Sequence, residues 1–178
     1  MTSEKIGIII GTNRQNSLSG KVAHYYKKQL EFKGSSTEVI DLSKLPEDFA
    51  FSALYQNAGH NVDFNEFQVT IDRIQKFVVV VPEYNGSFPG VLKTFFDGLR
   101  YPDTFDDKKV ALVGISAGVL GNAVGLGHLN DILSYMGANV LGLRVKLGLM
   151  GNHFADNDFT LPVYKEFIDK QIKQLIAF

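Results

Sequence analysis

The sequence contains no cysteine, and this absence removes several kinds of chemistry at once. Without thiols the chain forms no disulfide scaffold, offers no thiolate ligand for zinc and has no cysteine nucleophile. No apolar run is long enough to cross a bilayer, because the longest runs have the length of strands. The first five residues lead directly into a strand and lack the layout of a signal peptide. We therefore expect a cytoplasmic protein with no membrane partner.

An excess of charge of either sign is also absent. The 18 Lys and Arg residues nearly balance the 19 Asp and Glu residues, which leaves a net charge of -1. Nucleic-acid binding favours a basic face, so no nucleic-acid partner is expected. The 4 histidines are far apart and show no ligand-like spacing, so no metal site is expected either.

Two common phosphate-binding patterns are missing. Gly11 and the Gly20-Lys21 pair have the wrong gap for a P-loop, and Val22 stands where a hydroxyl is needed. The dinucleotide fingerprint Gly-x-Gly-x-x-Gly does not follow the first strand. Asp41, near the end of the second expected strand, is therefore interpreted as a solvated strand end or a cap, not as a ribose ligand.

What the sequence does contain is an alternation of short Val- and Ile-rich runs with amphipathic segments. The runs suit strands that are buried on both faces. Strands are expected at residues 6–10, 37–42, 77–81, 110–115 and 140–145, and helices at residues 19–33, 65–76, 91–99, 122–136 and 161–177. The alternation predicts one α/β domain over residues 1–178, a flavodoxin-like doubly wound parallel sheet of five strands in the order 2-1-3-4-5, with helices on both faces. The stretch from Pro46 to Asp63 is expected to be a long loop, with at most a helical turn.

The loop between the first strand and the first helix is rich in hydrogen-bond donors. It carries hydroxyls at Thr12, Ser17 and Ser19 and a guanidinium at Arg14. In such a sheet, ligands bind beyond the carboxyl ends of the strands, and a helix N-terminus attracts phosphate. The loop therefore predicts a phosphate site, although Ser and Thr also serve as ordinary helix N-caps.

The loop after the third strand combines stiff, flat and polar residues. Pro82 begins it, Tyr84 offers a flat surface, and Asn85 both donates and accepts hydrogen bonds. Gly86 permits positive φ or close approach of a ligand to the backbone. With Glu83, these residues predict a wall for a planar heterocycle such as isoalloxazine. The alternative is a rigid turn whose aromatic residues pack in the core.

The loop after the fourth strand is small and glycine-rich, with Ser116 and Gly118 at its start. Small residues let a flat ligand approach the backbone. Alone, this loop is equally typical of an ordinary Gly-rich turn before a helix.

With these loops in place, the sequence resembles the NADPH-dependent FMN reductase family, over roughly residues 5–177. The resemblance implies bound FMN, hydride donation by NADPH or NADH, and reduction of small-molecule acceptors such as quinones, free flavin, azo compounds or chromate. It also implies a homodimer or homotetramer. The matching pieces are Gly11-Thr12-Asn13-Arg14 with Ser17, then Pro82-Glu83-Tyr84-Asn85-Gly86 followed by Pro89-Gly90-Val91-Leu92-Lys93, and Ser116-Ala117-Gly118 with Gly121.

The resemblance also assigns site residues. Thr12, Arg14 and Ser17, with Ser19 close by, would hold the FMN phosphate. The five residues from Pro82 to Gly86 would surround the isoalloxazine, and Ser116 and Gly118 would close its other edge. No catalytic side chain is expected, because the flavin carries the chemistry.

Two other hypotheses about the function stay open. The chain could be a flavodoxin-like electron carrier without enzymatic activity, or a flavin-free interaction module. Electron-carrying flavodoxins tend to be strongly acidic, which a net charge of -1 does not match. Arg100 and Tyr101 could reach a nucleotide phosphate or serve a surface or interface role. The charged run from Asp103 to Lys109 is interpreted as a solvated loop.

Overall fold

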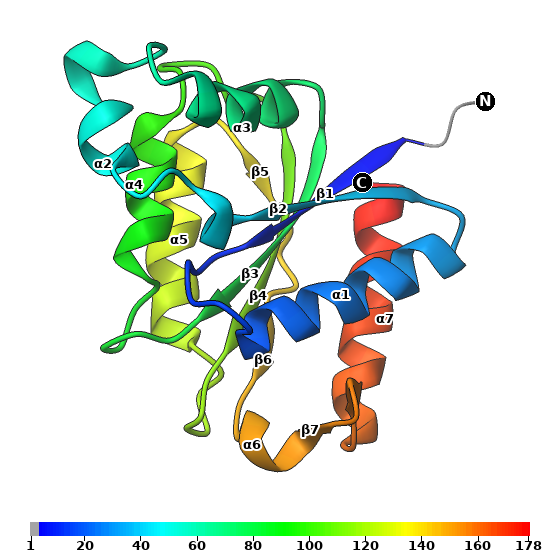
Figure 1. The fold of residues 1–178 in the computed structure, drawn as a ribbon. Helices are drawn as coiled ribbons and strands as arrows, with labels where there is room; N and C mark the ends of the chain where they lie inside the picture. The colour runs from blue at the N-terminus through cyan, green and yellow to red at the C-terminus, as the bar shows by residue number, and fades with distance from the viewer. Residues whose placement is uncertain (1–3) are drawn as a thin grey trace.

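A parallel sheet runs through the middle of the molecule, with helices on both of its faces (Figure 1). The structure is a computed structural model that describes residues 4–178. The strand order is β2-β1-β3-β4-β5, with every pair in this sheet parallel, which confirms the predicted topology. The strands are β1 (Lys5–Ile10), β2 (Ser36–Asp41), β3 (Lys76–Pro82), β4 (Lys109–Ile115), β5 (Asn139–Val140) and β6 (Val145–Leu147).

After the lysine with which each begins, the central strands β1, β3 and β4 carry no charged residue, and both of their faces are buried. Along β1, for example, Ile9 belongs to the core on one face, whereas Ile8 and Ile10 belong to the core on the other. One core is covered by α3 (Val62–Asp72), α4 (Gly90–Gly98) and α5 (Ala123–Tyr135), and the other by α1 (Leu18–Phe32) and α7 (Pro162–Ala177). This arrangement confirms the doubly wound architecture.

The expected fifth strand at residues 140–145 is wrong in detail, because the chain forms two short strands there. β5 pairs with Lys109 and Val110, and β6 pairs with β4 again from Val113 onward. Between them, the side chain of Gln171 donates hydrogen bonds to the carbonyl oxygens of Leu112 (2.9 Å) and Leu143 (2.7 Å). A buried amide from α7 thus replaces part of the strand ladder, which periodicity within the run cannot reveal.

The stretch from Pro46 to Asp63 contains more structure than the expected loop. It holds α2 (Phe49–Ser52), the short 3-10 helix η2 (Tyr55–Asn57) and the start of α3. Phe49 is buried and stacks on Phe64, with ring centroids 5.9 Å apart. The second strand also ends one residue early, because Leu42 begins the 3-10 helix η1 (Leu42–Lys44). Helix α3 begins and ends earlier than residues 65–76, because β3 already starts at Lys76.

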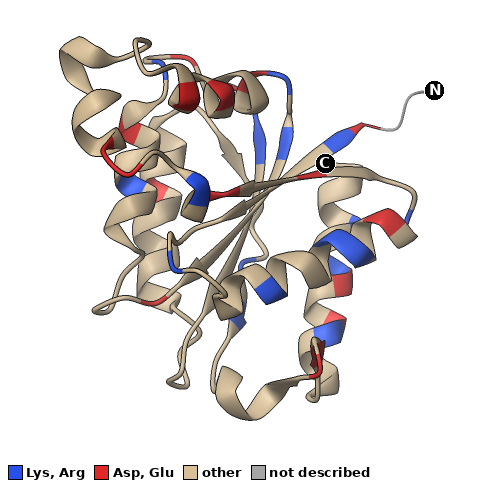
Figure 2. Ribbon diagram, in the orientation of Figure 1, with Lys and Arg blue, Asp and Glu red and all other residues tan. Residues whose placement is uncertain are grey.

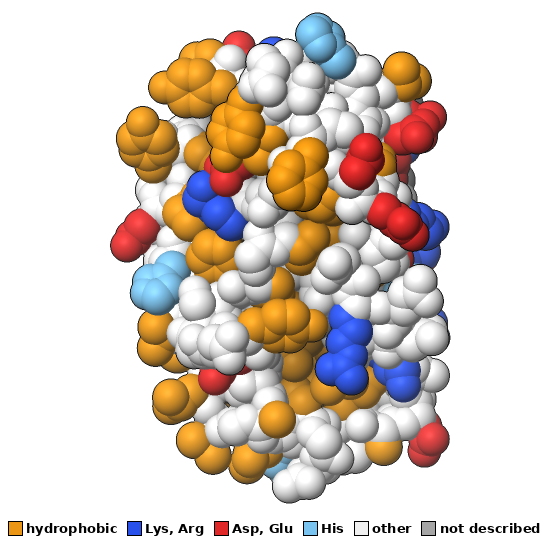
Figure 3. Space-filling model, turned by 60° about the vertical axis from the view of Figure 1, so that its left-hand side comes forward, with side chains coloured by type: hydrophobic (Ala, Val, Ile, Leu, Met, Phe, Trp, Pro, Cys, Tyr) orange, Lys and Arg blue, Asp and Glu red, His pale blue; other side chains and the backbone are white. Residues whose placement is uncertain are grey.

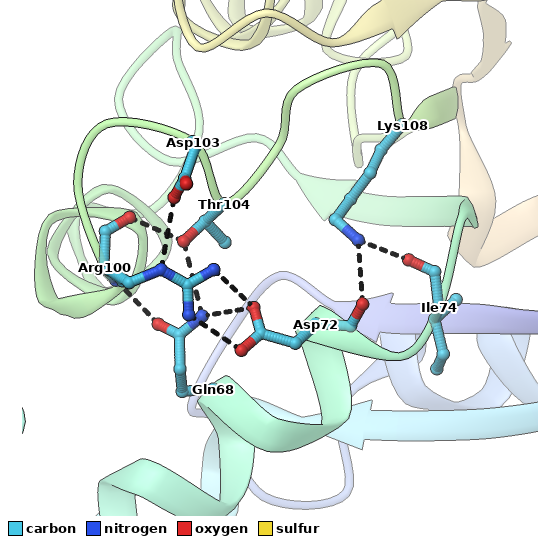
Figure 4. Close-up of polar contacts among 7 residues, drawn as sticks. All are labelled: Gln68, Asp72, Ile74, Arg100, Asp103, Thr104 and Lys108. Carbon is cyan, nitrogen blue, oxygen red and sulfur yellow. Dashed lines mark hydrogen bonds and ion pairs between the residues drawn. The ribbon is translucent and has the colours of Figure 1, made fainter.

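The charged run before β4 is not simply solvated, because Lys108 is buried (Figure 4). Its ammonium donates to the carbonyl oxygen of Ile74 at 2.6 Å. Burial lowers the pKa of Lys108, although the nearby Asp72 carboxylate opposes that shift. Arg100 makes a two-pronged ion pair with Asp72 (2.9 and 3.1 Å) and reaches Asp103 as well. Arg100 therefore ties the α4–β4 connection to α3.

The chain after β6 packs against the core that α1 and α7 cover. It forms α6 (Met150–His153) and a small hairpin of β7 (Phe154–Ala155) and β8 (Asp158–Phe159). Phe159 packs edge-on against Tyr25 of α1, with ring centroids 4.9 Å apart. Within residues 4–178, no helix has the length and apolar character needed to cross a membrane.

Candidate functional site

A cavity of about 610 Å³ lies beyond the carboxyl ends of β1, β3 and β4. This edge of the sheet contains the switch point between β1 and β3, where open α/β sheets bind ligands. The volume falls within the range of about 300–1,000 Å³ found for small-molecule sites. The lining residues are Thr12, Arg14, Gln15, Asn16, Ser17, Leu18, Ser19, Pro82, Glu83, Tyr84, Ile115, Ser116, Ala117, Met150 and Gly151.

The cavity therefore brings together most of the residues that the sequence analysis proposed. From that set, Asn85, Gly86 and Gly118 do not line it. The segment at Met150 and Gly151 was missed by the sequence analysis. It follows β6, and nothing in its composition sets it apart from an ordinary loop.

The loop before α1 is shaped by its own hydroxyls. Ser17 is the N-cap of α1, and its Oγ accepts a hydrogen bond from the N–H of Gly20 at 3.1 Å. The same hydroxyl keeps its proton for a second partner, so capping and phosphate binding are compatible. Ser19 lies in the first turn and is buried. The side chain of Arg14 is exposed and forms no ion pair or hydrogen bond with any residue from 4 to 178.

Thr12 joins the first loop to the second. It is fully buried, and its hydroxyl lies 2.9 Å from the hydroxyl of Tyr84. It also accepts a hydrogen bond from the N–H of Arg14 at 3.2 Å. The hydroxyl that the sequence offered to a phosphate thus positions the ring of Tyr84, which also lines the cavity.

The second loop is a tight turn with Asn85 and Gly86 at its tip. Tyr84 and Ser87 exchange main-chain hydrogen bonds of 2.9 and 3.0 Å. Asn85 has φ 51° and Gly86 has φ 74°, as a two-residue turn of this kind requires. Both tip residues are exposed, and their N–H groups have no partner within the described part of the chain. These two donors are available to a ligand at this edge.

Asn122 holds the start of the second loop in place through its side-chain amide. The sequence analysis did not single out this residue. It is fully buried, with φ 59°, at the start of α5. Its amide nitrogen donates to the carbonyl oxygens of Val81 (3.3 Å) and Pro82 (3.0 Å). The strand end that begins the second loop is therefore held by a side chain from 40 residues further along.

The third loop is held together by Ser116. Its hydroxyl donates to the carbonyl oxygen of Gly118 at 2.7 Å and accepts from the N–H of Gly121 at 2.9 Å. Gly121 has φ 56°, and a Cβ there would lie 2.5 Å from the nitrogen of Leu147. The loop is thus packed tightly against the end of β6. Ser116 lines the cavity, and a Cβ at Gly118 would meet no other atom within 4 Å.

These features fit FMN. A cavity with a capped helix N-terminus and a free guanidinium suits a phosphate, and a tyrosine with free backbone donors suits a planar ring with polar edges. Among residues 4–178, no group of His, Asp and Glu is arranged to hold a metal ion.

Comparison with known protein families places this site in context. The sequence model of the NADPH-dependent FMN reductases matches residues 4–148, which include all three loops. The chain belongs to this family. Members of the family are described as NADPH-dependent and as acting with FMN, which agrees with the cofactors that the resemblance implied.

Individual relatives support the assignment. The chain is 30% identical to a 2-hydroxy-1,4-benzoquinone reductase from a Burkholderia species over 139 residues, which cover 74% of this chain and 71% of that relative. It is also 30% identical to a quinone reductase from Escherichia coli K12, with 99% of this chain and 95% of that relative covered. A crystal structure of an NADH:FMN oxidoreductase superposes with a TM-score of 0.81 at 18% identity, covering 98% of this chain and 89% of that one. This last likeness shows the shared fold.

Proposed function

We propose that this member of the FMN reductase family oxidises NADPH or NADH and reduces small acceptors, quinones first among them, at the cavity beyond β1, β3 and β4. The observation that carries the proposal is that one cavity unites the loop before α1 with the wall formed by Pro82, Glu83 and Tyr84. FMN, when bound, supplies the hydride chemistry, and the protein supplies binding and orientation.

In this proposal the first loop holds the phosphate. Ser17 donates its hydroxyl proton while its oxygen caps α1, and Arg14 neutralises charge. Thr12 and Ser19 are both buried, so in this proposal they stabilise the conformation of the loop. The positive end of the α1 dipole adds to the attraction.

The second and third loops orient the ring. The N–H groups of Asn85 and Gly86 are free to donate to its polar edge, where they would stabilise the negative charge of the reduced ring. Tyr84 gives a flat surface that its bond to Thr12 keeps in place. Pro82 and Glu83 form the start of this wall. Ser116 limits the opposite edge, and its hydroxyl bonds to Gly118 next to the cavity.

The acceptor proposed first is a quinone, because two relatives of the chain are quinone reductases. The overall exchange transfers a hydride, which carries two electrons and one proton, from the nicotinamide nucleotide and a second proton from solvent, to yield a hydroquinone and the oxidised nucleotide. Donor and acceptor would use the same open face in turn, which predicts ping-pong kinetics.

We also propose that residues 1–178 act as one FMN-binding domain in the cytoplasm and that the chain forms a homodimer or homotetramer. Exposed aromatic residues support the assembly. Tyr101 and Tyr135 are 80% and 82% exposed beside a cavity of about 810 Å³ between α4 and α5. Figure 3 shows hydrophobic side chains gathered on this side of the molecule. Aromatic residues are enriched in protein interfaces.

A visible spectrum tests the enzymatic proposal directly. The purified protein is mixed with FMN, desalted and then treated with NADPH or NADH without oxygen. We expect a retained flavin spectrum that bleaches rapidly and returns when benzoquinone is added. Initial rates at several fixed quinone concentrations should give parallel double-reciprocal lines.

Other results would contradict the proposal in distinct ways. Retained flavin that neither nucleotide bleaches would indicate an electron carrier. A protein that retains no flavin would indicate an interaction module and would remove the assigned roles of the site residues.

A further inference from the structure

His128, on α5, contacts the second loop and has no role in the site as described so far. Its Nδ1 lies 2.9 Å from the hydroxyl oxygen of Ser87. Ser87 is the last residue of the tight turn in that loop, and it exchanges main-chain hydrogen bonds with Tyr84, the first residue of the turn. The imidazole therefore holds the base of the turn through a side-chain contact.

Three residues spaced three apart at the start of α5 meet this loop. Asn122 donates hydrogen bonds to two carbonyl oxygens at the end of β3. A Cβ at Gly125 would lie 2.7 Å from the carbonyl carbon of Ser87, so glycine is needed for this close approach of the helix to the turn. His128 comes three residues later, on the same side of the helix. The start of α5 is thus shaped to support the second loop along its length.

Charged side chains contribute nothing to this junction. Residues 84–92 and 110–130 contain no Lys, Arg, Asp or Glu, so the turn and the start of α5 are tan in Figure 2. Within residues 4–178, the bond to His128 is the only hydrogen bond that the side chain of Ser87 forms. A hydroxyl both donates and accepts, so this bond can form whether or not Nδ1 carries a proton.

The turn matters because of the two N–H groups at its tip. Those of Asn85 and Gly86 have no partner among the described residues, and both residues are exposed. Donors stabilise a developing charge best when they are fixed in place before the charge appears. Because solvent surrounds the tip, the base of the turn must supply that rigidity, as supporting hydrogen bonds do in other sites.

We propose that Ser87 and His128 are positioning residues, which aim the N–H groups of Asn85 and Gly86 so that they stabilise reduced FMN more than oxidised FMN. The inference rests on the proposed function, because it is there that these N–H groups are assigned to the ring. Neither Ser87 nor His128 lines the cavity, so both act through the turn. Hydrogen bonds to a negatively charged acceptor are about twice as strong as neutral ones, so a misplaced turn weakens the reduced complex more.

The first test compares the midpoint potential of bound FMN in the wild-type protein, Ser87→Ala and His128→Ala. Each variant should lose about tenfold in its affinity for reduced FMN relative to oxidised FMN. A tenfold change lowers the potential of a two-electron couple by about 30 mV. His128→Asn keeps a polar group at the place of Nδ1 and should restore the wild-type potential. His60→Asn is the matched control, because His60 is exposed and does not line the cavity.

A second test needs no flavin. The N–H groups of Tyr84 and Ser87 are bonded across the turn, so their hydrogen exchange, followed by NMR, measures how firmly it is held. In His128→Ala both amides should exchange about three- to tenfold faster, as the loss of one hydrogen bond implies. His128→Asn should restore their protection.

Distinct results would overturn the inference. They are an unchanged potential in both alanine variants, an equal fall in His60→Asn, and equal losses of affinity for oxidised and reduced FMN, which would show a purely structural role. Unchanged amide exchange in His128→Ala would contradict the positioning role alone. A wild-type protein that retains no flavin would instead contradict the proposed function and, with it, the assignment of the two N–H groups to the ring.

Discussion

At the scale of single residues, the contact between Thr12 and Tyr84 changes how the site is understood. Both residues were predicted from sequence as ligands of different parts of FMN. The structure joins them by a hydrogen bond of 2.9 Å across 72 residues of sequence, with Thr12 fully buried. Thr12 therefore positions Tyr84, and the two loops are coupled through one pair of hydroxyls.

A double-mutant cycle tests this coupling. Tyr84→Phe and Thr12→Val should each weaken FMN binding about three- to tenfold, because a hydrogen bond of this kind contributes about 0.5–1.5 kcal/mol. The double variant should lose little more than either single variant. Flavin fluorescence quenching measures the affinities, and Thr12→Ser, which keeps the hydroxyl, should bind nearly normally. Fully additive losses would show that the two hydroxyls act independently.

At the scale of elements, the ion pair between Arg100 and Asp72 fastens α3 to the connection after α4 (Figure 4). Hydrogen bonding by Arg100 lowers the pKa of Asp72, with partial burial opposing the shift. A carboxylate with a lowered pKa stabilises the folded state above its ordinary pKa of 3.8, and that stabilisation is lost as the pH falls through the lowered value.

The variant Asp72→Asn should therefore be less stable than the wild-type protein at pH 7, by about 0.5–1 kcal/mol, as is typical of partly exposed ion pairs. The difference should shrink as the pH falls from 3.8 through the lowered pKa of Asp72, because the wild-type carboxylate of the folded protein then also becomes neutral. Urea unfolding at a series of pH values measures it. Glu66→Gln, an exposed change on the same helix, should show no such dependence. A constant difference at every pH would exclude the charge of Asp72 as its cause.

At the scale of the whole molecule, one buried amide connects two helices to the sheet that they cover. Gln171 of α7 accepts a hydrogen bond from the hydroxyl of Tyr26 on α1 at 2.9 Å and donates to the carbonyl oxygens of Leu112 and Leu143. Burial raises the pKa of Tyr26 well above its usual value, so its hydroxyl stays protonated and donates. The network therefore links α1 and α7 to the sheet at the point between β5 and β6.

Replacing Gln171 with Leu should cost about 2–4 kcal/mol, because several buried polar groups lose their partners together. Tyr26→Phe should cost less, about 1 kcal/mol, because it removes only one of these hydrogen bonds. Chemical denaturation gives both values. Gln174→Leu, at an exposed position on the same helix, serves as the control. If Gln171→Leu unfolds like the control, the network does not stabilise the fold.

The assembly proposed for the chain makes a further prediction at this scale. Tyr135 is 82% exposed beside the cavity between α4 and α5, so Tyr135→Glu should shift the protein toward monomer. Light scattering after size-exclusion chromatography measures the mass. Phe32 is 86% exposed on α1, away from this cavity, and Phe32→Glu should leave the assembly intact. A wild-type protein that is monomeric at every concentration would contradict the proposed assembly.

The sequence by itself determined the order and kind of the main elements, the parallel sheet and the edge at which the site lies. These follow from local causes, since a strand buried on both faces must be apolar throughout, as in the run from Phe77 to Val81. Carboxyl ends of parallel strands must also share one edge, so three loops distant in the chain were expected to meet.

Only the tertiary structure decided what these residues contact. Gln171 interrupts the fifth strand, Lys108 is buried within a charged run, and Asn122 holds the end of β3, each through partners far away in the sequence. Thr12 likewise bonds to Tyr84, and Asn157 joins a cavity beside α1. Hydrophobic periodicity in a sequence indicates which residues are buried. A buried polar side chain forms hydrogen bonds with whichever groups the folded chain brings next to it. The identity of those partners leaves no periodic signal in the sequence.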